Sequence, residues 1–399
     1  MSLYSFFLLN VDYTLLIILG LVLTVFLLIK RKKVELHKLL FPLIYLIMYK
    51  TKWGLKSMDK FAKKISKRTK NILTYTSITT GFIGMAFILV TFLQSVYRYF
   101  FIERDMVVAP LLPGATIPGL PKLSFLHWII AIFILAAVHE FSHGLFARMH
   151  GIKVKSSGFA FFGILLPIIP AASVQPDEKQ MVKASKKKQL AVLSAGTFAN
   201  FITAFVFFII LMFVMSPLAG MAIAGQQGVV VGAVDDGGPA EMGGLPTGER
   251  ILDINGQEIN NLEEFFLILN STVAYEKIDV RTDQGEYTIT LGEHPQGEER
   301  GYIGLQLTPV LGWSGKLIIW LNILVYWLFL TNLMVGLINL LPMGMVDGGR
   351  MFYLALLTFI KKEKTANKIF GAVSIILLLL LLVFLIPALY NYFTAPFIK

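Results

Sequence analysis

Two histidines stand four residues apart in the run His139-Glu140-Phe141-Ser142-His143. On a helix this spacing places both imidazoles on one face, one turn apart, where they can occupy two corners of a tetrahedral metal site. Glu140 lies beside them and is free to act as a general base. These residue types at this spacing predict a bound zinc ion and hydrolysis of a peptide bond by activated water.

The alternative is a pair of helix histidines that neighbouring groups satisfy, with an unrelated glutamate between them. However, the motif ends a hydrophobic run long enough to cross a bilayer, where ionisable groups are costly and usually mark a working site. The metal interpretation is therefore favoured. The four other histidines lack such spacing and are expected at the surface or the membrane interface; they are His37, His127, His150 and His294.

The composition indicates a polytopic membrane protein. Of the 399 residues, 56% are hydrophobic and only 15% are charged, and the apolar residues come in blocks. This is far too apolar for an ordinary soluble protein. The chain has no cysteine, so any metal site must use histidine and carboxylate ligands.

Six hydrophobic runs are long enough to span about 30 Å of hydrocarbon at about 1.5 Å per residue. The predicted fold is therefore an α-helical polytopic membrane protein with about six transmembrane helices. The runs are 11–29, 72–93, 125–148, 189–216, 316–341 and 367–390.

The segments between these runs alternate between many and few lysine and arginine residues. The segments 30–70, 148–188 and 350–368 contain 14, eight and five of them, whereas segment 94–124 contains three. The positive-inside rule makes the first three segments cytoplasmic and the first run a permanent span rather than a cleaved signal peptide. The basic excess then reflects membrane orientation, and binding to nucleic acid is not expected.

Two short apolar stretches, Leu39 to Tyr49 and Phe159 to Pro170, are too short to cross the membrane. Both lie in predicted cytoplasmic segments and are candidates for interfacial or re-entrant structure. The first is flanked by lysines, so we expect a helix that lies on the membrane surface and binds anionic lipid.

The region from Gln226 to Leu307 differs from the rest of the chain. It contains 15 acidic and four basic residues, with strand-like alternation and turn glycines. Its runs Gly228-Val-Val-Val-Gly-Ala-Val and Gly244-Leu-Pro-Thr-Gly-Glu-Arg-Ile-Leu-Asp-Ile-Asn-Gly256 resemble a PDZ domain. An inserted soluble α+β PDZ-like domain is predicted here, on the outer side of the membrane.

A tetrahedral catalytic zinc needs a third protein ligand and an open position for water. Asp347, just past the fifth run, is the best candidate, because it falls at the same cytoplasmic end as the two histidines. A helix cap or a solvated loop charge is the alternative for this residue. Near the cytoplasmic start of the fourth run, Gly196 and Asn200 have the spacing of close helix packing, and Asn200 is expected at the depth of the metal.

Three motifs together resemble the site-2 protease family of intramembrane metalloproteases. They are His139-Glu-Phe-Ser-His143, Gly196-x-x-x-Asn200 and Asn339-x-x-Pro342-x-x-x-x-Asp347-Gly348, and the resemblance covers about residues 125 to 350. It implies that His139, His143 and Asp347 bind zinc, that Glu140 activates water, and that Asn200 and Asn339 hold substrate near the metal.

The resemblance also implies regulated cleavage of the membrane-spanning segment of single-pass substrate proteins, in the lipid bilayer and near its cytoplasmic face. It further implies a membrane-entering β-structure over residues 158–176, whose edge near residues 171–175 holds substrate. Two alternatives are a membrane zinc protease of another class, such as the prenyl-protein-processing enzymes, and an inactive membrane scaffold with a PDZ-like domain. No oligomeric state is predicted.

The predicted organisation has six parts. An N-terminal helix with a basic segment is followed by a second helix with its outer loop, the first part of a catalytic core, the PDZ-like domain, the second part of the core and a C-terminal helix. Their bounds are 1–71, 72–124, 125–225, 226–307, 308–350 and 351–399.

Overall fold

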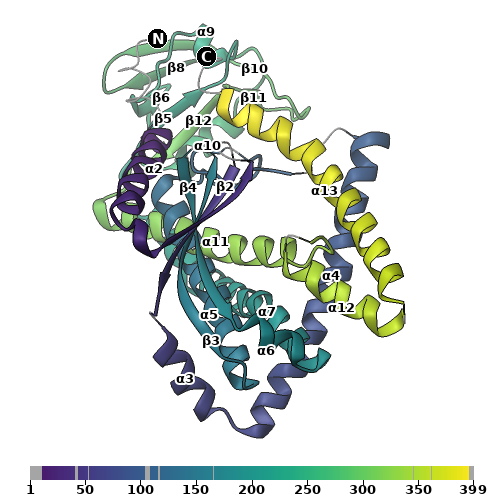
Figure 1. The fold of residues 1–399 in the computed structure, drawn as a ribbon. Helices are drawn as coiled ribbons and strands as arrows, with labels where there is room; N and C mark the ends of the chain where they lie inside the picture. The colour runs from purple at the N-terminus through teal and green to yellow at the C-terminus, as the bar shows by residue number, and fades with distance from the viewer. Residues whose placement is uncertain are drawn as a thin grey trace. The chain divides into compact units, whose positions relative to one another are not determined.

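The computed structural model describes residues 11–40, 44–52, 54–103, 108–115, 117–164, 166–344, 346–360 and 362–394. The ends of the predicted first and last segments, 1–10 and 395–399, and residues 41–43 of the first short apolar stretch lie outside these ranges. The chain divides into two compact units, which we call the helical unit and the sheet unit. The sheet unit comprises Ile209–Val325, and the helical unit contains the described residues on either side of it (Figure 1).

Within the described ranges, five helical segments are long and apolar enough to cross a membrane. They are α4 (Lys67–Phe101), α5 (Phe125–Met149), the continuous run Lys186–Ala224, α11 (Trp313–Ile338) and α13 (Glu363–Thr394). The run Lys186–Ala224 consists of α7 (Lys186–Ile210), the π-helical turn η2 (Leu211–Met215) and α8 (Ser216–Ala224). The first predicted run forms α2 (Val11–Ile29), a shorter apolar helix. The prediction of a helical polytopic membrane protein is thus confirmed.

The helix α4 shows how these helices combine lipid-facing and packed surfaces. Its large apolar side chains Ile83, Phe87 and Val90 are exposed, as contact with lipid requires. Its glycines Gly81 and Gly84 are buried, and a Cβ at Gly84 would lie 2.5 Å from Leu340 Cδ1. Small residues therefore allow α4 to lie close to the chain segment that precedes Asp347.

A four-stranded antiparallel sheet lies in the helical unit, with the order β1-β2-β3-β4. The strands are β1 (Val34–Leu40), β2 (Ile44–Thr51), β3 (Val154–Ile164) and β4 (Leu166–Pro176). The prediction of a surface helix over Leu39 to Tyr49 is wrong, because most of this stretch forms β2 and pairs with β3. The strands β3 and β4 agree with the β-structure that the family resemblance implied.

The strand β4 forms one edge of this sheet and packs against α5 and α2. Shorter helices complete the unit: η1 (Arg31–Lys33), α3 (Leu55–Lys64), α6 (Glu178–Lys183) and α12 (Asp347–Phe359). The helix α3 is amphipathic, and it buries Met58 against α5 while its lysines face outward. The helix α5 begins where Asp12 of α2 accepts a hydrogen bond from the Phe125 N–H at 2.8 Å, which satisfies a free helix donor.

Two histidines that were expected at the surface or interface are buried. His127 is 4% exposed and His150 is 8% exposed. His150 Nε2 lies 3.1 Å from the hydroxyl of Thr74, which donates its own proton to the Lys70 carbonyl. Burial, followed by the nearby charges of Lys70, Lys188 and Lys187, lowers the pKa of His150 to about 4. The expectation was wrong because a lone histidine carries no sequence signal of its partner.

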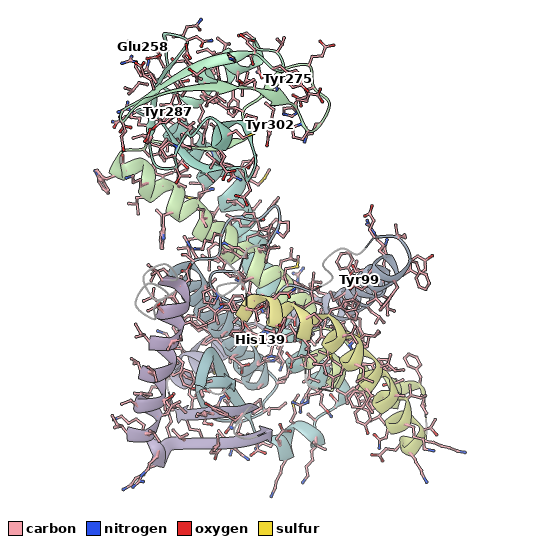
Figure 2. The ribbon with its side chains drawn as sticks, turned by 90° about the horizontal axis from the view of Figure 1, so that it is seen from above. Tyr99, His139, Glu258, Tyr275, Tyr287 and Tyr302 are labelled. Atoms are coloured by element: carbon pink, nitrogen blue, oxygen red, sulfur yellow. The ribbon has the colours of Figure 1, made fainter. Side chains whose placement is uncertain are left out.

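The sheet unit has its own hydrophobic core, with Val229, Ile251 and Val280 fully buried. Its main sheet has the strand order β12-β5-β6-β8-β9, and β7 pairs with β6. The strands and helices are β5 (Val229–Val234), α9 (Pro239–Met242), β6 (Arg250–Ile254), β7 (Gln257–Glu258), α10 (Leu262–Asn270), β8 (Lys277–Thr282), β9 (Glu286–Thr290), β10 (Gly292–Glu293), β11 (Gly301–Tyr302) and β12 (Leu305–Pro309). Figure 2 labels Glu258, Tyr275, Tyr287 and Tyr302 in this unit and His139 in the helical unit.

Candidate metal centre and catalytic cavity

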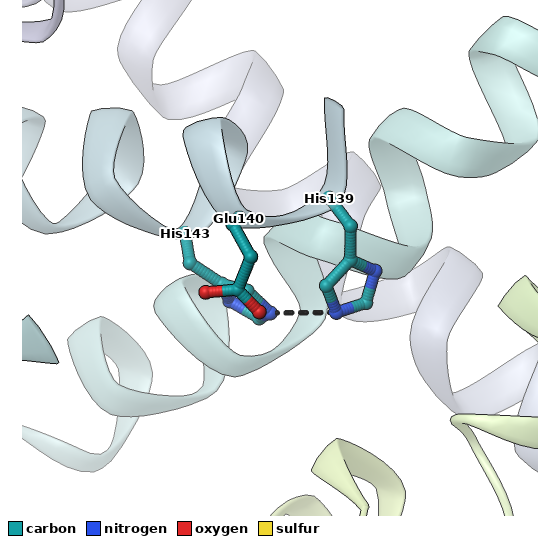
Figure 3. A group of neighbouring side chains, drawn as sticks. All are labelled: His139, Glu140 and His143. Atoms are coloured by element: carbon teal, nitrogen blue, oxygen red, sulfur yellow. Dashed lines mark hydrogen bonds between the residues drawn. The ribbon is translucent and has the colours of Figure 1, made fainter. Parts of the chain in front are cut away.

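The helix α5 presents both motif histidines from one face. The imidazoles of His139 and His143 point toward each other, and their Nε2 atoms are 3.0 Å apart (Figure 3). The carboxylate of Glu140 lies beside them, and one ligand atom from each of the three residues falls within 4.8 Å of the others. The four-residue spacing on a helix therefore has the geometric result that the sequence predicted.

Asp347 joins this pair from the first turn of α12. Its Oδ2 atom lies 3.1 Å from His139 Nε2 and 3.0 Å from His143 Nε2. Burial opposes ionisation of this carboxyl, but the adjacent imidazoles of His143 and His139 outweigh burial and lower its pKa below the usual value. The structure thus brings together a carboxylate and two imidazoles from segments that are about 200 residues apart in the chain.

Two glycines after Asp347 allow its placement. A Cβ at Gly348 would lie 2.2 Å from the carbonyl group of Leu340, and a Cβ at Gly349 would lie 2.0 Å from the Met343 carbonyl oxygen. The Gly348 N–H also donates to the Asn339 carbonyl at 2.8 Å. Only glycine permits such close backbone approach, so the start of α12 folds directly against the loop that follows α11.

The three converging atoms fit a zinc ion. Zinc bonds of about 2.0–2.2 Å in tetrahedral geometry separate neighbouring ligand atoms by about 3.3 Å. The observed separations of 3.0, 3.0 and 3.1 Å are close to this value. Catalytic zinc sites, unlike structural ones, have three protein ligands and leave a further position for water.

The outer nitrogen of each imidazole also has a partner. His143 Nδ1 donates a hydrogen bond of 2.7 Å to the Val192 carbonyl, which leaves Nε2 unprotonated and able to bind a metal. His139 Nδ1 lies 3.1 Å from the Asn200 amide nitrogen, while the buried Asn200 Oδ1 has no hydrogen-bond partner. Turning this amide by half a rotation lets Oδ1 accept a proton from Nδ1 of a metal-ligating His139.

Gly196 of α7 leaves the space that the ligand atoms need. A Cβ at this position would lie 2.5 Å from His143 Nε2 and 2.6 Å from His139 Nε2. The sequence predicted close helix packing from the spacing of Gly196 and Asn200, but not that the imidazoles are what Gly196 contacts. Any side chain at this position would press directly on the candidate metal ligands.

Glu140 is held by the edge of the sheet. Its Oε2 atom accepts a hydrogen bond of 2.8 Å from the Val174 N–H of β4. This contact places one carboxylate oxygen at the edge strand while the side chain remains beside the histidines. Sequence reasoning named the edge near residues 171–175 but gave no signal that its main chain binds Glu140.

A cavity of about 390 Å³ adjoins the ligands, and we call it the catalytic cavity. His139, Glu140 and Asp347 line it, together with Asn339. Asn200 does not line it and is fully buried, so the two asparagines that sequence reasoning grouped together occupy different environments. Arg350 also lines the cavity, three residues after Asp347 on the same helix face; sequence reasoning missed it, although this spacing was a usable signal.

Comparison with known proteins agrees with this geometry. The model of peptidase family M50 matches residues 127–384. An uncharacterized protein of Methanocaldococcus jannaschii is 28% identical over 300 residues, which are 75% of this chain and 74% of that protein. A Fusobacterium nucleatum protein is 25% identical over 63% of this chain and 89% of its own length, and a Clostridium perfringens protein is 22% identical over 61% and 86%.

Both of these bacterial relatives are named "Putative zinc metalloprotease". The family match covers more than half of the chain and includes every residue of the candidate site. It accounts for the apolar helices, the zinc-type ligand set and the adjacent glutamate together. The protein is therefore a membrane zinc metalloprotease of peptidase family M50, the site-2 protease family.

Proposed function

We propose that this protein hydrolyses peptide bonds within the membrane-spanning segments of single-pass membrane proteins. The observation that carries the proposal is the convergence of His139, His143 and Asp347 to within 3.0–3.1 Å of one another beside Glu140. Because His139 and His143 lie on a helix able to span the membrane, the bond that they act on is expected within the bilayer.

In this proposal His139, His143 and Asp347 hold the zinc ion. When bound, zinc acts as a Lewis acid that makes water more acidic and polarises a carbonyl group. Glu140 takes the proton of the attacking water and passes it to the nitrogen of the leaving amine. Because one Glu140 oxygen accepts the Val174 N–H, the carboxylate is oriented before substrate arrives.

The two asparagines have different roles in this proposal. Asn200 orients His139 through its Nδ1 atom, because its amide is buried against that imidazole. Asn339 lines the catalytic cavity, and its amide N–H groups can donate to the oxyanion that develops on the substrate carbonyl. A donor that is already in place costs little reorganisation when the negative charge appears.

A spanning helix must unwind before it can be cut, because its carbonyl groups are hydrogen-bonded along the helix. The free edge of β4 can hold the unwound segment by strand addition. Pairing with β3 leaves residues 170, 172, 174 and 176 facing that edge, and positions 170 and 176 are prolines, which lack an N–H. Between these prolines only Ala172 and Val174 carry an N–H that faces the edge, and the Val174 N–H already binds Glu140. The Ala172 N–H is therefore the donor left for a substrate strand beside Glu140.

The orientation of the chain follows from its charge pattern. The basic segments 30–70, 148–188 and 350–368 face the cytoplasm, and the active site lies near the cytoplasmic face of the membrane. The acidic sheet unit then lies on the outer side. Cleavage that releases a cytoplasmic fragment from a substrate requires this orientation.

The sheet unit is proposed to act as a PDZ-like domain that selects substrates. A cavity of about 100 Å³ lies between α10 and the β11–β12 segment, and Phe266, Leu269 and Leu305 are among the residues that line it. Because β12 is the edge strand of its sheet, an extended peptide can pair with it while apolar side chains enter this cavity.

The test is reconstitution of purified wild-type and Glu140→Gln protein in proteoliposomes that contain model transmembrane peptides. Cleavage read by mass spectrometry is expected for wild type and absent for Glu140→Gln, with zinc content unchanged in both. Glu363→Gln at the exposed start of α13 is the matched control and should cleave normally. Zinc bound without any Glu140-dependent cleavage would instead support an inactive membrane scaffold.

A further inference from the structure

A second cavity adjoins Glu140 on the side away from the metal ligands. Its volume is about 340 Å³, and we call it the apolar cavity. Residues of α5, of β3 and β4 and of α3 with its preceding Gly54 line it. Glu140, Ala136 and Ala172 line both this cavity and the catalytic cavity, so the two spaces meet at the proposed general base.

The two cavities lie on different faces of α5. Phe133, Ala137 and Phe141 repeat at four-residue steps and line the apolar cavity, whereas His139 points to the catalytic cavity. Glu140 lies one residue beyond His139, about 100° around the helix, and therefore stands between the two faces. One helix thus separates the candidate metal ligands from an apolar space while presenting the proposed base to both.

Four sheet residues beside the apolar cavity share one face of the β3–β4 pair. Ser157 is paired with Val174 and Phe159 with Ala172, so these four side chains project from the same side of the β3–β4 pair. All four residues line the cavity. A substrate strand added to the edge at Ala172 would place alternate side chains on this same side.

The apolar cavity has the chemistry and size of a side-chain pocket. Among the described residues that line it, Glu140 is the only charged one, and the others are aliphatic, aromatic, methionine, glycine or serine. An engineered apolar cavity of about 150 Å³ holds benzene. The apolar cavity, at about 340 Å³, can therefore hold a leucine or phenylalanine side chain, but it is too small for a helix.

We propose that the apolar cavity receives a large apolar side chain of the substrate residue next to the cleaved bond, and that Ala137 sets the size of side chain accepted. This inference rests on the proposed function. The lining residues that the apolar cavity shares with the catalytic cavity and the shared face of the edge strand favour a substrate side chain over a lipid acyl chain as the occupant.

The first experiment measures side-chain preference. The probe is a leucine–alanine transmembrane peptide of about 20 residues with a central Gly-Pro pair that weakens the helix. Each residue near the cleaved bond is changed in turn to glycine, alanine, leucine or phenylalanine. At one position leucine or phenylalanine is expected to raise kcat/KM at least tenfold over alanine, since one methylene in an apolar pocket is worth about 10–200-fold.

The second experiment fills the cavity with Ala137→Leu. The ratio of kcat/KM for the leucine peptide to that for the alanine peptide should fall at least tenfold. Ala86→Leu on the exposed surface of α4 is the matched control and should leave the ratio unchanged. An unchanged ratio in Ala137→Leu, with cleavage still dependent on Glu140, would overturn the inference but not the proposed function.

A third experiment does not require catalysis. Because the chain has no cysteine, Ala137→Cys in the Glu140→Gln background provides a single thiol. Disulfide formation with peptides that carry one cysteine should peak at the position that showed the side-chain preference, and Ala86→Cys should show no such peak. Equal cross-linking at all positions would contradict the proposed pocket, whereas absence of Glu140-dependent cleavage by wild type would overturn the proposed function as well.

Discussion

Replacing Gly196 by alanine adds one methyl group at the point where α7 meets the candidate ligands. The added Cβ would lie 2.5 Å from His143 Nε2 and 2.6 Å from His139 Nε2, whereas ordinary van der Waals contact begins at 3.4 Å. Relief of this overlap requires the imidazoles or α7 to move by about 0.8–0.9 Å. Metal sites tolerate ligand displacements of only about 0.2 Å, so zinc binding should suffer more than folding.

The expected loss can be given a magnitude. Overpacking of this kind costs about 1–3 kcal/mol of stability, and the better helix propensity of alanine returns up to about 1 kcal/mol. Loss of an outer-shell partner alone weakens metal binding about 10–100-fold, and direct displacement of two ligands should exceed that range. We therefore expect zinc affinity to fall at least 100-fold, while the folded protein survives.

The assay is a zinc titration of the purified protein against a competing chelator, with thermal unfolding of the metal-free protein measured in parallel. Gly371→Ala is the matched control, because Gly371 lies within α13 and its Cβ would meet nothing within 4 Å. This control should bind zinc as wild type does. Zinc affinity of Gly196→Ala within threefold of wild type would refute the argument that this glycine makes room for the ligands.

Three further outcomes are expected. Asn200→Ala should weaken zinc binding about 10–100-fold, because His139 loses its outer partner; unchanged zinc affinity with a raised KM would indicate a substrate-holding role instead. The free energy of unfolding should fall by as much as about 2.5 kcal/mol between pH 7.5 and 4.5. The pKa of His150 is about 4 in the folded state and about 6.5 in the unfolded state, so the unfolded state binds the proton first as pH falls. Thermal unfolding of His150→Asn should show a flatter pH profile, and a profile identical to wild type would contradict this. Phe266→Asp at the cavity of the sheet unit should alter the choice among peptides that carry outer extensions but leave cleavage of short peptides unchanged; equal loss on both would point to a structural role.

The long apolar helices were predictable because their length and composition leave few alternatives in a chain of this hydropathy. The strand structure of the short stretch that contains β2 was not predictable. An apolar run of that length has no periodicity that separates a strand from a buried helix. Its partner β3 begins about 100 residues later, so the pairing that decides its structure is not local.

The metal-binding motif was predictable because the spacing of His139 and His143 is local to one helix. The alternation of basic segments predicted Asp347 at the same membrane face as the histidines, but the orientation of its side chain depends on the close backbone contacts of Gly348 and Gly349. Those contacts, like the contact of Gly196 with the imidazoles, exist only after helices from distant parts of the chain have packed. The sequence indicated small residues at these positions, but it did not indicate their neighbours.

The position of Glu140 between two cavities would let the site combine polar chemistry with the apolar substrate that we propose. A charged base in lipid is costly unless it is hydrogen-bonded, and the Val174 N–H supplies such a bond from the strand proposed to hold the substrate. The face of α5 with His139 supplies polar groups for the reaction, and the adjacent face with Ala137 supplies an apolar surface. The register of the helix therefore links the choice of substrate side chain to the choice of the bond that is cut.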